Sequence, residues 1–205
     1  MKFASDDFNR ADGGLGANWT TITGALVPQI VSNQVQLPSV GGAIGAQALY
    51  TAITWPANQY AKCRVITLNT SNGRSAHVIL RGTTAARTQY ECLVQGPLGA
   101  TCTLRIDRLV AGALTNLAIT GANQTVNSGD VLMGTIVGST IRLYINDVLK
   151  LEASNGTHTS GTPGLVLYSS TGLVTDSQLD DWEGGEAGTT VLTGFGRRHR
   201  GFIYT

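Results

Sequence analysis

Two carboxylates near the end of the chain have a spacing that could support acid–base chemistry. Asp181 and Glu183 stand two residues apart in a stretch that alternates like a strand, which predicts both side chains on one face. A retaining glycosidase needs an acid and a nucleophile about 5–5.5 Å apart. Asp181 and Glu183 form the sole plausible acidic pair on a predicted strand. The alternative interpretation is the rim of a sheet or a structural cation site.

A histidine and two arginines are the next candidates. Residues 76–81 alternate so that His77 and Arg81 are expected on one strand face, and Arg105 could join them from a nearby strand. Such a group could bind an acidic sugar as in a polysaccharide lyase, with Tyr90 transferring the proton. The alternative is a polar sheet face that only makes hydrogen bonds.

Tyrosines extend this group into a possible glycan platform, because aromatic faces stack on sugar rings. The predicted glycan-binding residues are His77, Arg81, Tyr90, Arg105, Tyr60 and Tyr168. The alternative is an ordinary solvated sheet. The three histidines would also allow a Ser–His–Asp arrangement, but no Gly-x-Ser-x-Gly sequence supports one, and we assign no catalytic residue.

Oxygen-bearing side chains gather in the N-terminal segment 5–16, namely Asp6, Asp7, Asn9 and Asp12. Calcium prefers such ligands, so the aspartates predict a possible structural calcium site to which Asp181 could contribute. The segment is not an EF-hand, because Asn18 stands where the closing glutamate is required. The alternative is a turn held by side-chain to backbone hydrogen bonds. No other cofactor is expected.

Three cysteines leave at least one unpaired thiol. Cys92 and Cys102 flank the turn at 96–99, and symmetry about that turn would place them opposite each other. They could form a cross-strand disulfide or pack as two small buried residues. Cys63 is expected in the core, and the spacings match no zinc site.

Composition narrows the classes of function. The chain has 205 residues, 42% of them hydrophobic, which suits one large β domain with a sizeable core. Only 13% are charged and the net charge is +1, so nucleic acid is not an expected partner. No apolar run reaches the length of a membrane span, and residues 1–14 lack the apolar core of a signal peptide. We expect a virion-surface or extracellular location.

Alternation of period two, interrupted by turn residues, predicts strands throughout. Ile141, Leu143 and Ile145 alternate with polar residues and are followed by Asn146-Asp147, which can adopt positive φ at both turn positions of a hairpin. Further strands are predicted at 47–55, 59–69, 76–81, 89–95, 101–109, 114–119, 131–137, 165–169 and 177–183. No window has helical periodicity. The chain is therefore predicted to be an all-β, antiparallel two-sheet sandwich.

Several stretches also resemble a known family. They are DDFNRADGGLGANW at the start, QYAKCRV, VILRG, IRLYINDVLK and SGTPGL inside, and LDDWEGG near the end. In this order they resemble concanavalin A-like (laminin G-like) lectin/glucanase jelly-roll domains over about residues 3–185. The resemblance implies curved sheets with the first and last strands adjacent. It implies no single activity, because the fold carries lectins, glycosidases, lyases and structural modules.

Glycosidases of this fold carry E-x-D-x-x-E or E-x-D-x-E on one strand. The four glutamates of this chain, Glu91, Glu152, Glu183 and Glu186, do not form either motif. We therefore expect a protein that is not an enzyme.

Residues 186–205 differ from the sandwich, residues 1–185. This C-terminal arm combines glycines, a basic cluster and an apolar end, and its predicted partner-contact residues are Arg197, Arg198, Arg200, Phe202, Ile203 and Tyr204. Such a segment is expected to dock on a neighbouring subunit or on another protein. The alternative is an arm folded back on its own domain.

Three functions follow from these features. The first is a non-enzymatic structural or decoration protein of a virus particle, of the tailed-phage type, that displays a lectin-like sandwich and docks through its arm. The second is a carbohydrate-binding module that recognises cell-surface or polysaccharide glycans. The third is a polysaccharide lyase or hydrolase. The predicted partners are a homo-oligomer, other virion proteins and glycans, with no nucleic acid and no membrane.

Overall fold

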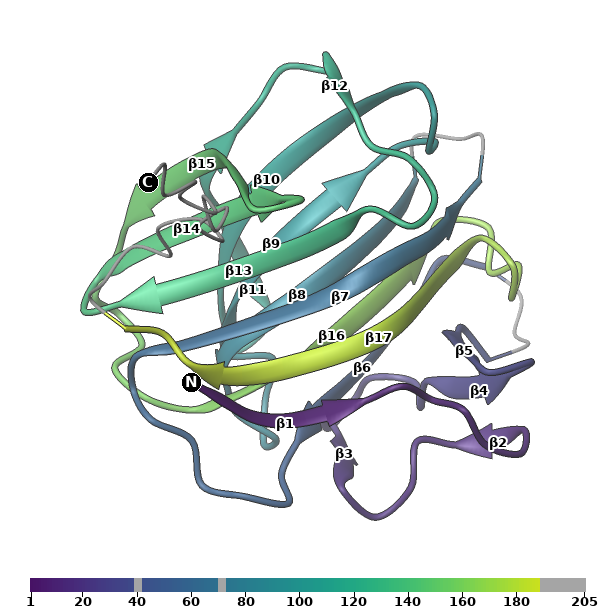
Figure 1. Ribbon diagram of the computed structural model, residues 1–205, viewed down its shortest axis with the longest axis horizontal. Coiled ribbons are helices and arrows are strands. Elements are labelled where there is room, and N and C mark those ends of the chain that lie inside the picture. Colours follow the sequence, from purple (N-terminus) through teal and green to yellow (C-terminus); the bar gives the residue numbers. More distant parts are fainter. Residues whose placement is uncertain (39–41, 70–72, 189–205) are drawn as a thin grey trace, which may run out of the picture.

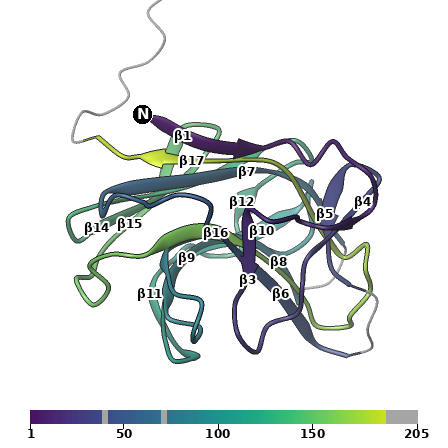
Figure 2. The ribbon, with the colours of Figure 1, turned by 90° about the horizontal axis from the view of Figure 1, so that it is seen from below.

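The computed structural model describes residues 1–38, 42–69 and 73–188. Within these residues the chain forms 17 strands and no helix, and the strands make two antiparallel sheets that pack face to face. Figure 2 shows the two layers, with β1 (Lys2–Asp6), β17 (Ser177–Glu186) and β7 (Gln59–Leu68) in one of them. The predicted all-β sandwich is confirmed. No helix of the described residues is long and apolar enough to cross a membrane.

Sheet A, the nine-stranded sheet, has the order β15-β14-β13-β7-β17-β5-β4-β2, and β1 pairs with β17 (Figure 1). Besides the strands above it contains β2 (Gly13–Gly14), β4 (Gln29–Val31), β5 (Gln34–Gln36), β13 (Val131–Val137), β14 (Thr140–Ile145) and β15 (Val148–Ser154). Sheet B, the eight-stranded sheet, has the order β11-β10-β9-β8-β16-β6-β3, and β12 pairs with β10. Its strands are β3 (Trp19–Thr21), β6 (Ile44–Tyr50), β8 (Arg74–Gly82), β9 (Gln89–Gln95), β10 (Thr101–Val110), β11 (Ala113–Ile119), β12 (Gln124–Thr125) and β16 (Thr162–Ser169).

The alternation read from the sequence decides which side chains enter the core. On β7, Ala61, Cys63 and Val65 are buried between the sheets, while Tyr60 and Lys62 lie on the outer face of sheet A. Apolar area removed from water in this way stabilises the sandwich by roughly 25 cal/mol per Å².

Trp182 of β17 fills one end of the core. Its ring is fully buried. The centroid of this ring lies 4.9 Å from the ring centroid of Trp19 and 5.2 Å from that of Tyr50. Trp55, which was expected at the end of a strand, stands in the loop after β6 and packs edge-on against Trp182.

The hairpin of β14 and β15 turns as predicted at Asn146 and Asp147, whose φ angles are +50° and +62°. Short side chains that tolerate the left-handed region allow a two-residue turn of this twist.

The predicted symmetry of the two cysteines about the 96–99 turn is wrong. Cys92 pairs with Ile106 across β9 and β10, whereas Cys102 pairs with Gln124 of β12. Four residues separate Cys102 from Ile106 along β10, or roughly 13 Å at the rise of a strand, so no bond can join the thiols. All three cysteines are free and buried.

The first and last strands lie side by side, as the resemblance implied. β1 pairs with β17 from Lys2↔Gly185 to Asp6↔Trp182, and the Met1 carbonyl accepts a hydrogen bond from the Glu186 amide. The six arm residues predicted to contact a partner, Arg197 to Tyr204, lie outside the described residues.

Candidate functional site

The outer face of sheet B, the face turned away from sheet A, carries polar side chains that are almost wholly buried. His77 is 7% exposed and Glu91 1%, although the described residues form no third sheet that could cover them. Strand alternation puts them there, because Ala76, Val78 and Leu80 of β8 point into the core between the sheets. Buried polar groups must find hydrogen-bond partners, and here they find one another.

Three of these side chains form a continuous chain of contacts. Ser75 and His77 are two residues apart on β8 and share its outer face, and Ser75 Oγ lies 2.6 Å from His77 Nε2. The other ring nitrogen, His77 Nδ1, lies 2.6 Å from Oε2 of Glu91 on β9. We call this arrangement the Ser75–His77–Glu91 chain.

Glu91 is held ionised at the closed end of this chain. Its second oxygen, Oε1, accepts a hydrogen bond of 2.6 Å from Gln89 Nε2. Burial alone would raise the pKa of Glu91, but the charge and hydrogen bond of His77 and the bond from Gln89 lower it below its ordinary value. The side-chain amides of Gln89 and Gln47 also lie 3.1 Å apart, which brings β9 and β6 into contact on this face.

An ion pair stands beside this chain on the same face. Arg105 Nη2 of β10 lies 2.8 Å from Asp107 Oδ2, and Asp107 Oδ1 accepts a hydrogen bond from Asn116 Nδ2 of β11. In the register of the sheet, Arg105 pairs with Leu93, which pairs with His77. Arg105 therefore lies two strands from His77, with 23% of its side chain exposed.

An apolar cluster closes another part of the outer face. Ile22, from the segment between β3 and β4, packs with Leu49, Ile79 and Val166, and Ala25 packs against them. Tyr168 of β16 lies outside this cluster. It pairs with Ser75 in the register and is 36% exposed, so its ring offers an accessible aromatic surface next to the Ser75–His77–Glu91 chain.

Two predicted members of the glycan platform face elsewhere, and their assignment to this face is wrong. Arg81 has φ +50° at a β-bulge, which turns its guanidinium toward three backbone carbonyls, those of Ala57, His158 and Gly138. Tyr90 is fully buried in the core, where its hydroxyl donates to the Asn155 carbonyl. Neither side chain can reach a ligand on this face.

Tyr60 is the third predicted platform residue that lies apart from the others. It stands on the outer face of sheet A, and its hydroxyl donates to Glu183 Oε1 over 2.6 Å. Burial and that hydrogen bond raise the pKa of Tyr60. The structure thus brings together only His77, Arg105 and Tyr168 of the six.

Asp181 and Glu183 border one groove of about 330 Å³ on sheet A. Each carboxylate is paired with a basic side chain. Asp181 Oδ2 lies 3.0 Å from Arg64 Nε, and Glu183 Oε1 lies 3.2 Å from Lys62 Nζ. Burial would raise the pKa of Glu183, but the Tyr60 hydroxyl and Lys62 lower it. A carboxyl group with a lowered pKa is a poor proton donor, unlike the acid of a glycosidase.

The aspartates predicted as calcium ligands make other contacts. Asp6 accepts hydrogen bonds from Nη1 and Nη2 of Arg10, at 2.6 and 2.9 Å, and its Oδ2 also accepts one from the Trp19 indole N–H. Asp7 Oδ1 accepts the amide of Asn9 over 3.1 Å, as in a turn held by side-chain to backbone bonds.

The four aspartates do not converge on one point. Asp6, Asp7 and Asp181 border the sheet A groove, whereas Asp12 binds the amide of Ser32. In the part of the chain that the structure describes, no group of three or more His, Cys, Asp or Glu side chains could hold a metal ion. The calcium site stays a prediction, and the contacts of Asp6, Asp7 and Asp12 favour its alternative, a turn held by hydrogen bonds.

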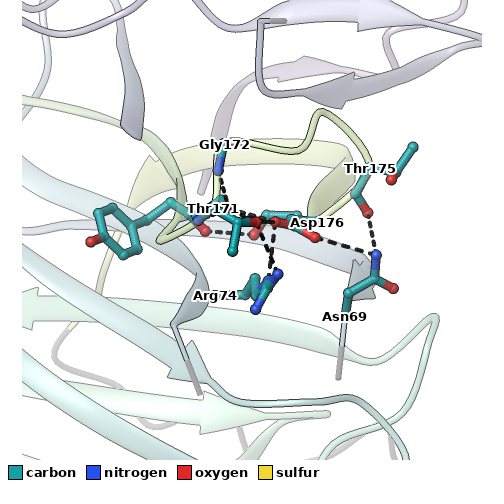
Figure 3. A network of polar contacts seen from close by, with 9 residues as sticks. Asn69, Arg74, Thr171, Gly172, Thr175 and Asp176 are labelled. Carbon is teal, nitrogen blue, oxygen red and sulfur yellow. Dashed lines mark hydrogen bonds and ion pairs between the residues drawn. The ribbon is translucent and has the colours of Figure 1, made fainter. Parts of the chain in front are cut away.

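Another buried polar network lies at the end of the sandwich where β16 leads into β17 (Figure 3). Asp176 Oδ2 accepts hydrogen bonds from the hydroxyls of Ser169 and Thr171, and Ser169 Oγ in turn accepts the backbone amides of Thr171 and Gly172. The hydrogen bonds of this network hold backbone amides of the loop, so the role of the network is to fix the loop conformation.

Sequence reasoning missed Ser75, Gln89 and Glu91 as members of the site. The alternation of 89–95 already places Gln89 and Glu91 opposite Tyr90, Cys92 and Val94, so the face could have been read from the sequence. The partnership of Ser75, His77 and Glu91 could not, because it depends on the pairing of β8 with β9.

No protein-family model matches the sequence, and no characterised protein matches it by sequence. Solved structures do match the fold. A carbohydrate-binding module, CBM66 from Bacillus subtilis, is 17% identical with a TM-score of 0.60, over 80% of this chain and 92% of that one. The Emp47p carbohydrate recognition domain is 12% identical with a TM-score of 0.59, over 89% and 94%.

A third similar structure comes from a virus. The CBM2 module of the evolved Dit protein of Lactobacillus casei BL23 phage J-1 is 10% identical with a TM-score of 0.59, over 89% of this chain and 94% of that one. At such identities the likeness concerns the fold. The two sheets, their order and these matches show that the chain has the concanavalin A-like lectin/glucanase jelly-roll fold.

Proposed function

We propose that the protein is a carbohydrate-binding module that recognises glycans through the outer face of sheet B. The observation that carries this proposal is the combination, on one face, of an accessible tyrosine and buried polar side chains held in fixed orientations. Tyr168 offers its ring, Arg105 a partly exposed guanidinium, and Ser75 and His77 a hydrogen-bonded hydroxyl and imidazole. Sugars are bound by this pairing of an aromatic surface with oriented donors and acceptors.

The similar solved structures support the proposal. Two of them are described as a carbohydrate-binding module and a carbohydrate recognition domain. We also propose that the protein does not cleave glycosidic bonds. Support for this comes from Asp181 and Glu183, which are paired with Arg64 and Lys62 rather than arranged as an acid and a nucleophile.

The binding test compares the two sheets of one protein. Full-length protein is run through native gels that each contain one polysaccharide. For every polysaccharide that retards the protein, calorimetry then measures the dissociation constant. Tyr168→Ala and Arg105→Ala are expected to weaken binding about tenfold each, which corresponds to about 1.4 kcal/mol. Tyr144→Ala and Arg142→Ala are the matched controls, because both side chains lie on the outer face of sheet A.

Two results would contradict the proposed site. The first is no retardation of the full-length protein by any polysaccharide of a broad panel. The second is a loss of binding in the sheet A controls with the sheet B variants unaffected.

A phage particle is the second candidate setting, because a module of phage J-1 Dit shares the fold. In this proposal the domain is displayed on the virion surface, and the arm, residues 186–205, docks on further copies or on other virion proteins. Light scattering on the full-length chain should then give a multiple of the 21.5 kDa monomer mass that disappears when residues 189–205 are removed. A monomer in both cases would remove the assembly part of this proposal.

A further inference from the structure

The Ser75–His77–Glu91 chain has the order of groups that activates a serine for nucleophilic attack. The hydroxyl meets one ring nitrogen at 2.6 Å, and the other ring nitrogen meets a buried carboxylate at 2.6 Å. When the neutral imidazole carries its proton on Nδ1, facing Glu91, Nε2 is free to accept the Ser75 proton. A nucleophile, a base and an orienting acid in this relation recur on unrelated folds and are recognised by geometry rather than by sequence position.

We propose that Ser75 is the nucleophile of an acyl-transfer site in which His77 is the general base and Glu91 orients His77, and that the site cleaves ester bonds of O-acylated sugars. The acyl-transfer chemistry follows from the three side chains alone, and esters are the expected acyl donors because an alkoxide leaves more readily than an amide nitrogen. The sugar part of the substrate rests on the proposed function, because Tyr168, the aromatic surface of the binding face, is the cross-strand neighbour of Ser75.

The reaction balances without any further reagent. Ser75 Oγ attacks the acyl carbon while its proton passes to His77 Nε2, and a tetrahedral intermediate forms. The intermediate collapses to an acyl-serine as the sugar oxygen leaves and takes the proton from His77. Water then attacks the acyl-serine with His77 as base, which releases the carboxylic acid and restores the Ser75 hydroxyl.

The burial of the Ser75–His77–Glu91 chain agrees with this role. Ser75 and His77 are nearly buried, at 5% and 7% exposed, so only a small part of each reaches the surface, whereas Glu91, at 1%, is closed off from solvent. The contacts of the chain run from side chain to side chain. The Asp176 network, by contrast, binds the loop amides of Thr171 and Gly172 through Ser169, which is what a purely structural cluster does.

The sheet also limits the rate to be expected. β8 is paired on both sides, with β9 and with β16, so its backbone N–H groups are engaged in the sheet and do not form an oxyanion hole. The developing oxyanion would depend on side-chain donors next to Ser75, and its register neighbours are Gln95 and Tyr168. Loss of a single oxyanion donor lowers kcat by about 10²–10³-fold, so a slow esterase is expected.

The test uses full-length protein, a fluorophosphonate probe and p-nitrophenyl acetate. The probe should phosphonylate Ser75, located by peptide mass spectrometry, and the ester should release p-nitrophenol. Ser75→Ala should abolish both signals. His77→Gln should slow both by roughly 10²-fold, the contribution of a general base, and Glu91→Gln should also slow them. Ser139→Ala is the control, because Ser139 is an exposed serine on the loop between β13 and β14.

Failure to label Ser75 above the level at Ser139, or labelling that His77→Gln leaves unchanged, would overturn the proposal. Ser75→Ala removes the hydrogen-bond partner of the nearly buried His77 ring, so its thermal unfolding is measured first, and a lost signal from a variant that is folded at the assay temperature reports chemistry rather than unfolding.

A second experiment tests the sugar substrate. It uses acetylated xylan and other O-acetylated polysaccharides and measures the acetate that is released. Labelling of Ser75 without acetate release would keep the nucleophile and overturn the sugar substrate. The two proposals are distinguished on one preparation of the full-length protein, because retardation by a polysaccharide without labelling of Ser75 would keep the binding function and overturn the nucleophile.

Discussion

Arg74 Nε lies 3.1 Å from Asp176 Oδ2, and this ion pair fastens the start of β8 to the loop before β17 while both side chains are almost wholly buried. Arg74 Nη2 also donates to Thr171 Oγ1 over 3.0 Å (Figure 3). Arg74 lies on the strand that carries the proposed site, one residue before Ser75 and three before His77. It therefore anchors the strand that presents Ser75 and His77.

Removing the charge of Asp176 should destabilise the protein. Asp176→Asn leaves the Arg74 guanidinium buried without its counter-ion, and breaking a buried pair in this way costs about 3–5 kcal/mol. Urea unfolding should show a lower midpoint with an unchanged slope. Asp147→Asn, in the exposed β14–β15 turn, is the matched control and should change the free energy of unfolding by less than about 0.5 kcal/mol. Equal effects of the two variants would contradict the anchoring role.

The same pair contributes to stability in a definite pH range. Burial would raise the pKa of Asp176, but the hydrogen bonds from Ser169 and Thr171 and the contact with Arg74 lower it below 3.8. A carboxyl group with a lowered folded pKa stabilises the native state fully above its unfolded pKa, and this contribution is lost as the pH falls through the folded value. The difference in unfolding free energy between wild type and Asp176→Asn should therefore shrink below about pH 4, as followed by urea titrations from pH 7 to pH 2. A difference that stays constant over this range would contradict the ionised state of Asp176.

At Gly134 of β13 the two sheets approach each other closely. A Cβ atom at this position would lie 2.9 Å from Cys92 Sγ and 3.0 Å from Val78 Cγ2, both from sheet B. Gly134→Ala should therefore lower the free energy of unfolding by about 1–3 kcal/mol through overpacking. At Gly156, where a Cβ would meet only Ser139 at 4.0 Å, the same substitution should have little effect. Thermal unfolding of the two variants measures the contrast, and an unchanged Gly134→Ala would show that the core is looser than described.

The three thiols should be unreactive in the native protein. Burial raises the pKa of Cys63, Cys92 and Cys102 and keeps the thiolate, the reactive form, scarce. Ellman's reagent at pH 8 should detect no thiol in the folded state and three after unfolding in guanidinium. A lower count in the unfolded protein would show that a disulfide forms after all.

Removal of divalent cations should leave stability unchanged. A calcium ion bound only by the native state would raise the melting temperature, but the Asp6 carboxylate is already occupied by Arg10, Trp19 and the Phe8 amide. We expect the same melting temperature in EDTA and in millimolar calcium. A calcium-dependent rise that Asp6→Ala or Asp181→Ala abolishes would instead establish the site suggested by the aspartate cluster.

Much of the fold could be predicted from the sequence because strand alternation and turn chemistry are local. The strand predicted at 59–69 and the turn predicted at Asn146 and Asp147 depend on neighbouring residues alone, and both predictions are confirmed. The same alternation places His77 on an outer face. It also places Tyr90 in the core beside Cys92, so the prediction for Tyr90 failed although the pattern was present.

The site itself depended on contacts between distant parts of the chain. Arg81 does not lie on the predicted face, because a bulge against β16 changes its backbone conformation. Tyr60 lies on the other sheet, because β7 pairs with β13 and β17.

The sequence by itself determined an all-β chain, the direction of most side chains within each strand, and the turns that join them. Only the tertiary structure decided that Ser75, His77 and Glu91 meet and that Tyr168 lies beside them. The reason is that alternation decides the face within one strand, whereas partners across strands are set by register and bulges, which the packing of the whole sandwich selects.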